Sequence, residues 1–159
     1  MIFLIMGVTG SGKSTVGRML ANCLGWVYLE ADDFHSTANK EKMHRGEPLT
    51  EADRLPWLAT MHAELQKQDA QGKSVVLACS ALREEYRRIL AEGLDVKLIY
   101  LRGSRELIAD RLNQRKQHFA GVAILNDQFA TLEEPQNALT IDIKERPEEI
   151  VETILGKVL

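Results

Sequence analysis

The sequence predicts an α/β fold in three layers, with a five-stranded parallel sheet flanked by helices. Short apolar runs alternate with longer amphipathic stretches along the chain, which is typical of strands joined by crossover helices. The chain has no internal repeat, no low-complexity tract and no linker rich in proline, glycine and serine. Its 159 residues are therefore expected to form a single domain, 1–159.

The boundaries of the elements follow from local sequence signals. The apolar runs predict strands at 2–6, 26–29, 74–79, 96–101 and 139–143. The amphipathic stretches predict helices at 13–24, 51–71, 83–92, 105–115 and 147–158. Thr50, with Asp53 three residues later, is a capping signal, and Pro147 followed by two glutamates is expected to begin the last helix. In such sheets ligands bind beyond the carboxyl ends of the strands, so functional residues are expected just after them.

Composition and charge exclude several classes of partner. Hydrophobic residues make up 45% and charged residues 27% of the chain, and the formal net charge is -3 with both signs interspersed. We expect no nucleic-acid partner and no membrane partner, since either would favour a basic face. The apolar run from Met1 to Met6 has no basic leader and is too short to span a membrane, so a cytoplasmic protein is expected.

The chain has two cysteines, Cys23 and Cys79. Each has apolar neighbours in the sequence, and neither belongs to a Cys-x-x-Cys pair. Both are therefore expected to be buried free thiols rather than a disulfide or a metal site.

A glycine-rich motif, Gly7 to Ser14, follows the first strand and opens the first helix. Its sequence GVTGSGKS matches the phosphate-binding pattern of a glycine, four residues and Gly-Lys-Ser. The glycines let consecutive amides point at phosphate oxygens, and the helix N-terminus adds a favourable dipole. Lys13 would bridge the transferring phosphates and Ser14 would bind Mg²⁺. The predicted nucleotide-binding residues are Gly7, Val8, Thr9, Gly10, Ser11, Gly12, Lys13, Ser14 and Thr15.

This P-loop occurs in several classes of protein, which other features of the chain distinguish. A GTPase would need an Asn-Lys-x-Asp segment, which the sequence lacks. An ATPase motor would carry an acidic residue at the end of an apolar strand, whereas the third predicted strand ends in Cys79-Ser80. The sequence therefore favours phosphoryl transfer to a small molecule.

An acidic segment, Glu30 to His35, follows the second predicted strand. A carboxylate at this position can orient an acceptor hydroxyl and take its proton, or hold magnesium through water. A solvated acidic loop is the alternative, and the position at a strand end favours a function for Asp32. Asp33 is expected to be its solvated neighbour or the cap of the next helix.

A second polar segment begins the long helix predicted at 51–71. Arg54 could pair with Asp53 on the surface or reach a carboxylate on a substrate, and the residues alone leave both open. Trp57 and Leu58 are expected in the core rather than against a ligand.

The motifs of residues 1–135 together resemble the gluconate kinase family. The resemblance rests on Gly7 to Ser14, Asp32-Asp33-Phe34-His35, Asn39 to Met43, Gly46 to Thr50, Asp53 to Leu58, Cys79 to Arg83, Tyr86-Arg87, Arg111-Leu112, Arg115, His118-Phe119, Gln128-Phe129, Thr131-Leu132-Glu133 and Pro135. A shikimate kinase would have a Gly-Gly-Gly turn where this chain has Ser80-Ala81-Leu82. The sequence differs from the usual family pattern at Ala120-Gly121, where Met-Pro is common, and at Arg83, where lysine is usual.

The resemblance implies a P-loop kinase that transfers phosphate from ATP, with Mg²⁺, to the 6-hydroxyl of D-gluconate. It places Asp32 opposite the acceptor hydroxyl and makes His35, Arg54, Ser80 and Arg83 candidate contacts for the sugar acid. Relatives of this kind suggest a homodimer, and their loop after the last strand passes over adenine. A kinase of another polyol acid, of a shikimate-like substrate or of a nucleoside is the alternative, and an ATP-binding regulator without transferase activity is the alternative from another class.

Basic residues cluster at and just after the C-terminus of the helix predicted at 105–115. Arg111, Arg115, Lys116 and His118 could be cations favourably placed at a helix C-terminus. Together with the resemblance, they favour a mobile lid at about 112–127 that closes over ATP. In that lid Arg111 would contact the nucleotide, and Arg115 would stabilise charge on the transferred phosphoryl group. Lys116 is expected to face solvent, and the role of His118 stays open.

Overall fold

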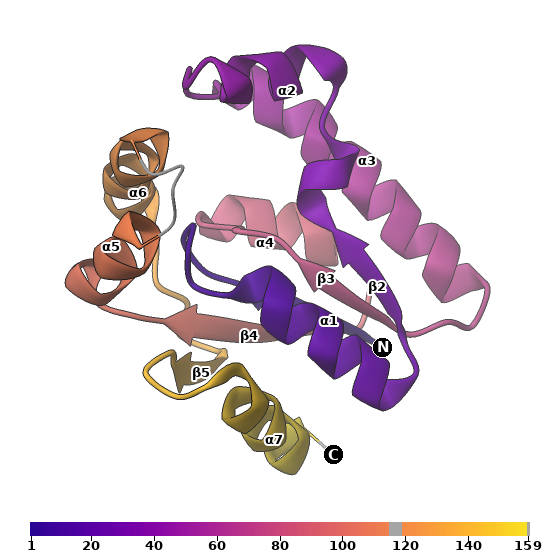
Figure 1. The fold of residues 1–159 in the computed structure, drawn as a ribbon. Coiled ribbons are helices and arrows are strands. Elements are labelled where there is room, and N and C mark those ends of the chain that lie inside the picture. The colour runs from indigo at the N-terminus through magenta and orange to yellow at the C-terminus, as the bar shows by residue number, and fades with distance from the viewer. Residues whose placement is uncertain (115–118, 159) are drawn as a thin grey trace.

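A five-stranded parallel sheet forms the centre of the molecule, as predicted (Figure 1). The computed structural model describes residues 1–114 and 119–158. The strands lie in the order β2-β3-β1-β4-β5. Their bounds are β1 (Ile2–Met6), β2 (Val27–Glu30), β3 (Val75–Ala78), β4 (Val96–Arg102) and β5 (Leu139–Asp142). β1 is the central strand, with β3 and β2 on one side of it and β4 and β5 on the other. The connections to the two sides run in opposite directions, and parallel sheets bind ligands in the crevice that forms where they diverge.

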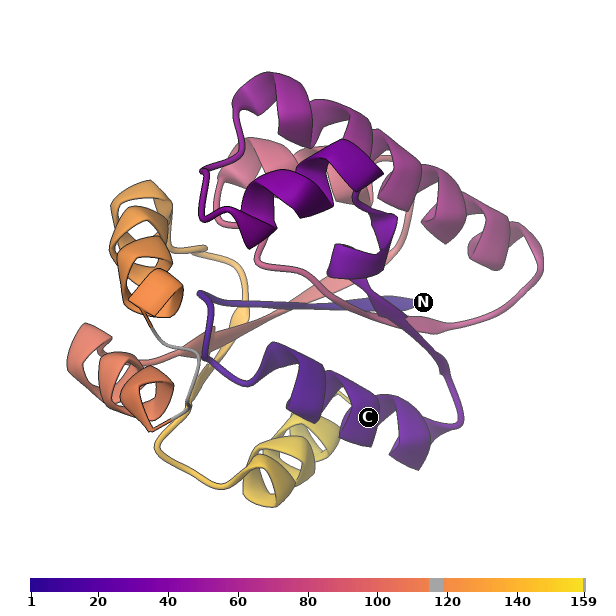
Figure 2. The same cartoon turned by 45° about the horizontal axis from the view of Figure 1, so that its top comes forward.

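Helices cover both faces of the sheet, and further helices stand beyond the carboxyl ends of its strands (Figure 2). One face carries α1 (Lys13–Leu24) and α7 (Pro147–Val158), and the other carries α3 (Glu51–Ala70) and α4 (Glu84–Ala91). A 3-10 turn, η1 (Ala31–Phe34), and α2 (Thr37–His44) connect β2 to α3. The pair α5 (Arg105–Asn113) and α6 (Phe119–Thr131) stands beyond the carboxyl ends of the strands. The three predicted layers are therefore present.

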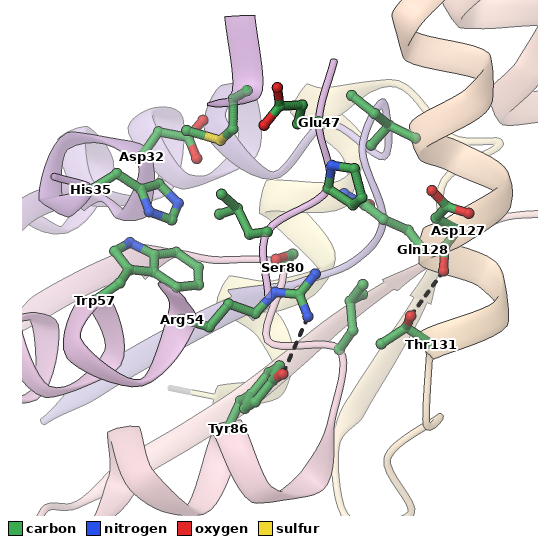
Figure 3. Close-up of a pocket in the computed structure, with 15 residues that line it drawn as sticks. Asp32, His35, Glu47, Arg54, Trp57, Ser80, Tyr86, Asp127, Gln128 and Thr131 are labelled. Carbon is green, nitrogen blue, oxygen red and sulfur yellow. Dashed lines mark hydrogen bonds between the residues drawn. The ribbon is translucent and has the colours of Figure 1, made fainter. Parts of the chain in front are cut away.

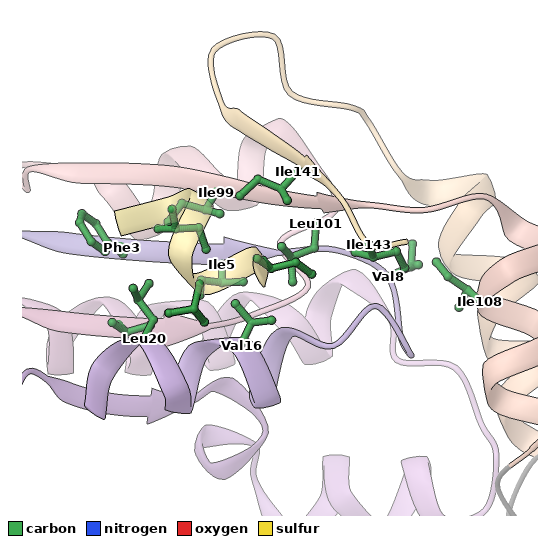
Figure 4. Packing of buried hydrophobic residues seen from close by; sticks show 14 of the residues in the cluster. Phe3, Ile5, Val8, Val16, Leu20, Ile99, Leu101, Ile108, Ile141 and Ile143 are labelled. Atoms are coloured by element: carbon green, nitrogen blue, oxygen red, sulfur yellow. The ribbon is translucent and has the colours of Figure 1, made fainter. Parts of the chain in front are cut away.

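Each face of the sheet has its own apolar core because successive strand residues point to opposite faces. On β1, Phe3 and Ile5 pack with residues of α1 and α7, such as Leu20 (Figure 4). The alternate residues of the same strand pack with Leu58 and Met61 of α3. All five residues of β1 are therefore buried. The phosphate-binding motif that follows β1 starts from a strand that is packed on both faces.

Terminal signals in the sequence set the helix boundaries. Thr50 and Asp53 form the predicted capping box, in which each side chain accepts a hydrogen bond from the backbone amide of the other. Pro147 begins α7 as predicted. Gly25 caps the C-terminus of α1, with a left-handed φ of 69° and an amide that donates to carbonyls of the last turn.

Two helices were not predicted from periodicity. α2 buries only Asn39 and has no apolar stripe, so its helix signal is the cap alone, in which the Ser36 hydroxyl accepts from the Asn39 amide. The sequence of α6, FAGVAILNDQFAT, is mostly apolar and does not show the separate apolar and polar faces on which the other helix predictions relied. Residues 119–127 of α6 fall within the segment where the lid is predicted, for which the sequence showed no helix signal.

The prediction that Cys23 is buried is wrong, whereas Cys79 is buried as expected, and both thiols are free. α1 buries a stripe made of Val16, Gly17, Leu20 and Ala21. Cys23 lies at the margin of this stripe in the last turn, where its apolar sequence neighbours do not enclose it. Among the described residues, no helix combines the length and apolar character needed to cross a membrane.

Candidate active site

The phosphate-binding motif Gly7–Ser14, called the phosphate loop below, wraps from the end of β1 into the first turn of α1. Gly10 and Gly12 have φ values of 79° and 94°, which side chains rarely adopt. A Cβ atom at Gly10 would come within 3.1 Å of Ile108 and 3.2 Å of Leu112, both on α5. Glycine is thus required for the backbone path and for the close packing of α5 against the loop.

Lys13 lies inside the phosphate cavity, which is lined by Thr9, Gly10, Gly12, Lys13, Ser14 and Thr15 on its loop side. Its Nζ donates to the Val8 carbonyl at 3.1 Å, so the side chain folds back over the loop. Burial lowers the pKa of the Lys13 ammonium, while the carboxylates of Asp32 and Glu30 act in the opposite direction. The cavity therefore combines backbone amides with one lysine cation, a donor set suited to polyphosphate.

The Ser14 hydroxyl and the Glu30 carboxylate meet beside the loop. Ser14 Oγ donates to Glu30 Oε2 at 2.7 Å, and the hydroxyl of Tyr28 donates to the same oxygen. Burial and the Glu30 carboxylate raise the pKa of Tyr28, so its hydroxyl keeps its proton. Hydroxyl and carboxylate oxygens are ligands that Mg²⁺ prefers, and the donor set at this point fits that ion.

Asp32 stands in η1, directly after β2, and faces both the phosphate cavity and a second cavity beside it. Asp32 is solvent-exposed, but partial desolvation of its carboxyl group raises the pKa, repulsion from Glu30 adds to this, and Lys13 lowers it. A carboxylate with a raised pKa is a stronger base, as proton abstraction from a hydroxyl requires. Asp33 is exposed, as predicted, whereas the cap of the next helix is Ser36.

The second cavity, called the acceptor cavity below, lies between α3, the turn after β3 and α6 (Figure 3). Its walls include Asp32, His35, Arg54, Trp57, Ser80 and Tyr86. Four of the predicted site residues, Asp32, His35, Arg54 and Ser80, are therefore brought together here.

His35 lines the acceptor cavity as a neutral ring. It stacks on Trp57 with a centroid distance of 4.1 Å, and Asn39 Nδ2 lies 3.3 Å from its Nδ1. Because an NH₂ group only donates, Nδ1 accepts, and the ring proton lies on Nε2. Burial, and next the charges of Lys40 and Arg54, lower the pKa of His35 to about 4. His35 can thus donate a hydrogen bond to a substrate oxygen at neutral pH without adding charge.

Arg54 supplies the positive charge of the acceptor cavity (Figure 3). Its Nη1 lies 3.4 Å from the Tyr86 hydroxyl, to which it donates. Asp53 pairs instead with Lys42 at 2.8 Å, so the ion pair between Asp53 and Arg54 is not formed. The sequence left two partners open for Arg54, and the structure leaves its guanidinium facing the cavity.

The turn after β3 is held by a buried arginine. Ala81 has a left-handed φ of 44°, which is unfavourable for a residue with a side chain. Arg87 donates to the Ala81 carbonyl at 2.7 Å and to the Glu133 carbonyl at 2.9 Å. This turn presents Ser80 to both cavities. Arg83, at its end, lies 3.7 Å from Glu51 and does not line the acceptor cavity, so its contact with a sugar acid stays a prediction.

The predicted lid is described only in part. Arg115, Lys116 and His118 lie outside the described residues. Arg111 is described, and its guanidinium donates to the Ile143 carbonyl in the segment between β5 and α7. Its contact with the nucleotide stays a prediction.

Several residues of the site were not assigned to it from the sequence. Trp57 is buried in the core as predicted, but it also lines both cavities. The wall formed by α6 consists of Ile124, Asp127, Gln128 and Thr131. Their spacing of three, one and three residues places them on one helical face, which would have indicated a shared role had a helix been predicted there.

Comparison with known proteins places the chain in a family. A family model described as "AAA domain" matches residues 2–135. "Probable gluconokinase" from Rattus norvegicus is 44% identical, covering 97% of this chain and 95% of the relative. The chain belongs to the gluconokinase family. The resemblance noted in the sequence is thereby confirmed.

Two solved structures support the same family assignment. A gluconokinase from Sinorhizobium meliloti 1021 is 38% identical with a TM-score of 0.85, covering 97% of this chain and 89% of that one. A sugar kinase from Janibacter sp. HTCC2649 is 37% identical with a TM-score of 0.91, covering 98% and 92%. This chain thus shares both sequence and fold with gluconokinases along nearly its whole length.

Proposed function

We propose that the protein transfers the γ-phosphoryl group of ATP to the 6-hydroxyl of D-gluconate. The observation that carries this proposal is the junction of two cavities at Asp32, one built for phosphates and the other carrying the cation Arg54. A sugar acid with its carboxylate at Arg54 would turn its far hydroxyl toward Asp32. The names of the related gluconokinases support the same substrate.

Each group has a defined task in this reaction. The amides of the phosphate loop and Lys13 hold the nucleotide phosphates and neutralise charge as the phosphoryl group leaves. Asp32 orients the acceptor hydroxyl and takes its proton. Ser14 and Glu30 would hold Mg²⁺, which supplies charge neutralisation on the phosphates. His35 donates to a hydroxyl of the sugar acid, and Ser80 lies where it can contact the same substrate.

Replacement of the proposed base tests this assignment. We expect Asp32→Asn to lower kcat by about a hundredfold or more, because the amide accepts no proton. In the wild type, kcat should fall at acidic pH as the carboxylate becomes protonated, and the raised pKa of Asp32 shifts this fall upward from the usual carboxyl range. The variant should lose this acid limb. Asp33→Asn, which alters the neighbouring carboxylate, is the control and should keep the wild-type kcat at neutral pH, with only a small downward shift of the acid limb. An unchanged kcat with a higher Mg²⁺ requirement would make Asp32 a metal-shell group instead.

The lid is the second part of the proposal. We expect closure of about 112–127 over ATP, with Arg115 acting on the transferred phosphoryl group. Arg115→Ala should therefore lower kcat more than it weakens ATP binding, since the contact matures in the transition state. Steady-state kinetics and calorimetric titration with ATP measure the two effects, with Lys116→Ala as the control. Equal turnover and equal affinity would return Arg115 to a surface cation.

The activity itself is tested by ADP release with a panel of acceptors. The panel contains D-gluconate, other sugar acids, shikimate and nucleosides, each with ATP and Mg²⁺. Preferred turnover of D-gluconate is expected, and turnover of shikimate or a nucleoside instead would select the alternative kinase. ATP binding without turnover of any acceptor would favour a regulator.

The family and the composition lead us to propose three further properties. We expect a requirement for Mg²⁺, a homodimer and a location in the cytoplasm. Omission of the metal from the assay, light scattering on the purified protein and fractionation of cells test them in turn.

A further inference from the structure

Gln128, on α6, makes a contact with the phosphate loop that the reaction described above does not use. Its Oε1 accepts a hydrogen bond of 2.6 Å from the Thr9 amide, across 119 positions of sequence. Thr9 lies in the part of the loop that precedes Gly10 and the helix start. The phosphate loop is therefore tied to α6 as well as to β1 and α1.

The side chain of Gln128 lies on the boundary between the two cavities. Together with Asp32, Trp57 and Ser80, it lines both the phosphate cavity and the acceptor cavity. A phosphoryl group that moves from the nucleotide to the acceptor has to cross this boundary. Any polar group placed there can contact the group in transit.

The hydrogen bond to Thr9 also orients the Gln128 amide. A carboxamide has one acceptor oxygen and one NH₂ group, and here the oxygen faces the loop. The NH₂ group carries two protons on the other branch of the same planar amide. It is therefore a donor, at the boundary, for oxygens that gain negative charge during transfer.

Contacts at the middle of α6 and just after its end position this donor in the structure. At its middle, Leu125 is fully buried, and Asn126 Oδ1 accepts from Arg105 Nε of α5 at 2.8 Å. Just after its end, the Glu133 amide donates to the Leu82 carbonyl at 2.8 Å. The helix is thus anchored both to α5 and to the turn that carries Ser80.

We propose that Gln128 is a further catalytic residue, whose Oε1 holds the Thr9 amide while its NH₂ group donates to the phosphoryl group in transit. This rests on the proposed kinase activity. The proposal gives the oxygen and the NH₂ group of the same amide different tasks, and substitutions can separate the two. Gln128→Glu keeps an oxygen for Thr9 but replaces the donor by a carboxylate oxygen, whereas Gln128→Met removes both polar ends at similar size.

The test compares steady-state kinetics of both variants with those of the wild type. Each variant should lower kcat by about 10²- to 10³-fold, the usual effect of removing one preorganised donor. The KM values for D-gluconate and ATP should change by far less than kcat, and Gln128→Glu should lose at least as much as Gln128→Met. Gln136→Met makes the same chemical change at an exposed position after α6 and should behave like the wild type.

Several outcomes would overturn this assignment. Wild-type kcat in Gln128→Met would leave the residue without a catalytic role, and wild-type kcat in Gln128→Glu would restrict it to holding the loop. If Gln128→Met fails to fold, as judged by thermal unfolding, the isosteric Gln128→Glu still decides between donor and loop contact. The proposed function fails separately, since it requires the wild type itself to phosphorylate D-gluconate in the same assay.

Discussion

Lys13→Ala is expected to lower kcat for phosphoryl transfer by about a thousandfold or more, because it removes the charged donor that faces the transferred phosphates. The fold should persist. Glycines at positions 10 and 12 set the path of the loop, and alanine is well suited to the first position of α1. The one protein hydrogen bond that Nζ makes among the described residues, to the Val8 carbonyl, contributes only about 1 kcal/mol.

The experiment pairs kcat from the coupled ADP assay with the melting temperature. Lys73→Ala, at an exposed position before β3, is the matched control and should retain both. A melting temperature near that of the wild type, with turnover lost, is the expected pattern for Lys13→Ala. Near wild-type turnover would contradict the assignment of the phosphate loop.

Most of the site was predictable because its residues follow strands. The phosphate loop follows β1, Asp32 follows β2, and Ser80 follows β3. In a parallel sheet the carboxyl ends of these strands meet at one edge, so position along the chain predicts proximity in space. For this reason a motif after β1 and a carboxylate after β2 could be joined into one site without a structure.

The remaining part of the site lies on helices whose packing could not be predicted from the local periodicity of the sequence. α6 is apolar on most sides, so the pattern that predicts an amphipathic helix is weak there, and Gln128 received no role. The stacking of Trp57 on His35 depends on the path of η1 and α2 between β2 and α3. Likewise, the exposure of Cys23 depends on which side of α1 the sheet covers, which its sequence neighbours do not specify.

The second large effect is expected from the acceptor. D-gluconate should be phosphorylated efficiently, whereas D-glucose and sorbitol, with similar hydroxyls but no carboxylate, should be very poor substrates. Loss of the charge-assisted pair with Arg54 costs about 2 to 5 kcal/mol when it leaves a desolvated cation unpaired. That cost corresponds to about one and a half to four powers of ten in kcat/KM. Efficient phosphorylation of D-glucose by the wild type would overturn the sugar-acid assignment.

The role of Arg54 in this selectivity can be measured directly. Arg54→Ala should raise KM for D-gluconate much more than KM for ATP, because Arg54 lines the acceptor cavity and not the phosphate cavity. Arg54→Lys keeps the charge but loses the planar fork, so it should fall between the alanine variant and the wild type. Arg88→Ala, at an exposed position on α4, is the control. The discrimination between D-gluconate and sorbitol should shrink in Arg54→Ala, since the variant no longer has a cation to leave unpaired. Unchanged gluconate kinetics would move the carboxylate contact elsewhere, and Arg83, which pairs with Glu51 at only 3.7 Å, is the next cation to test.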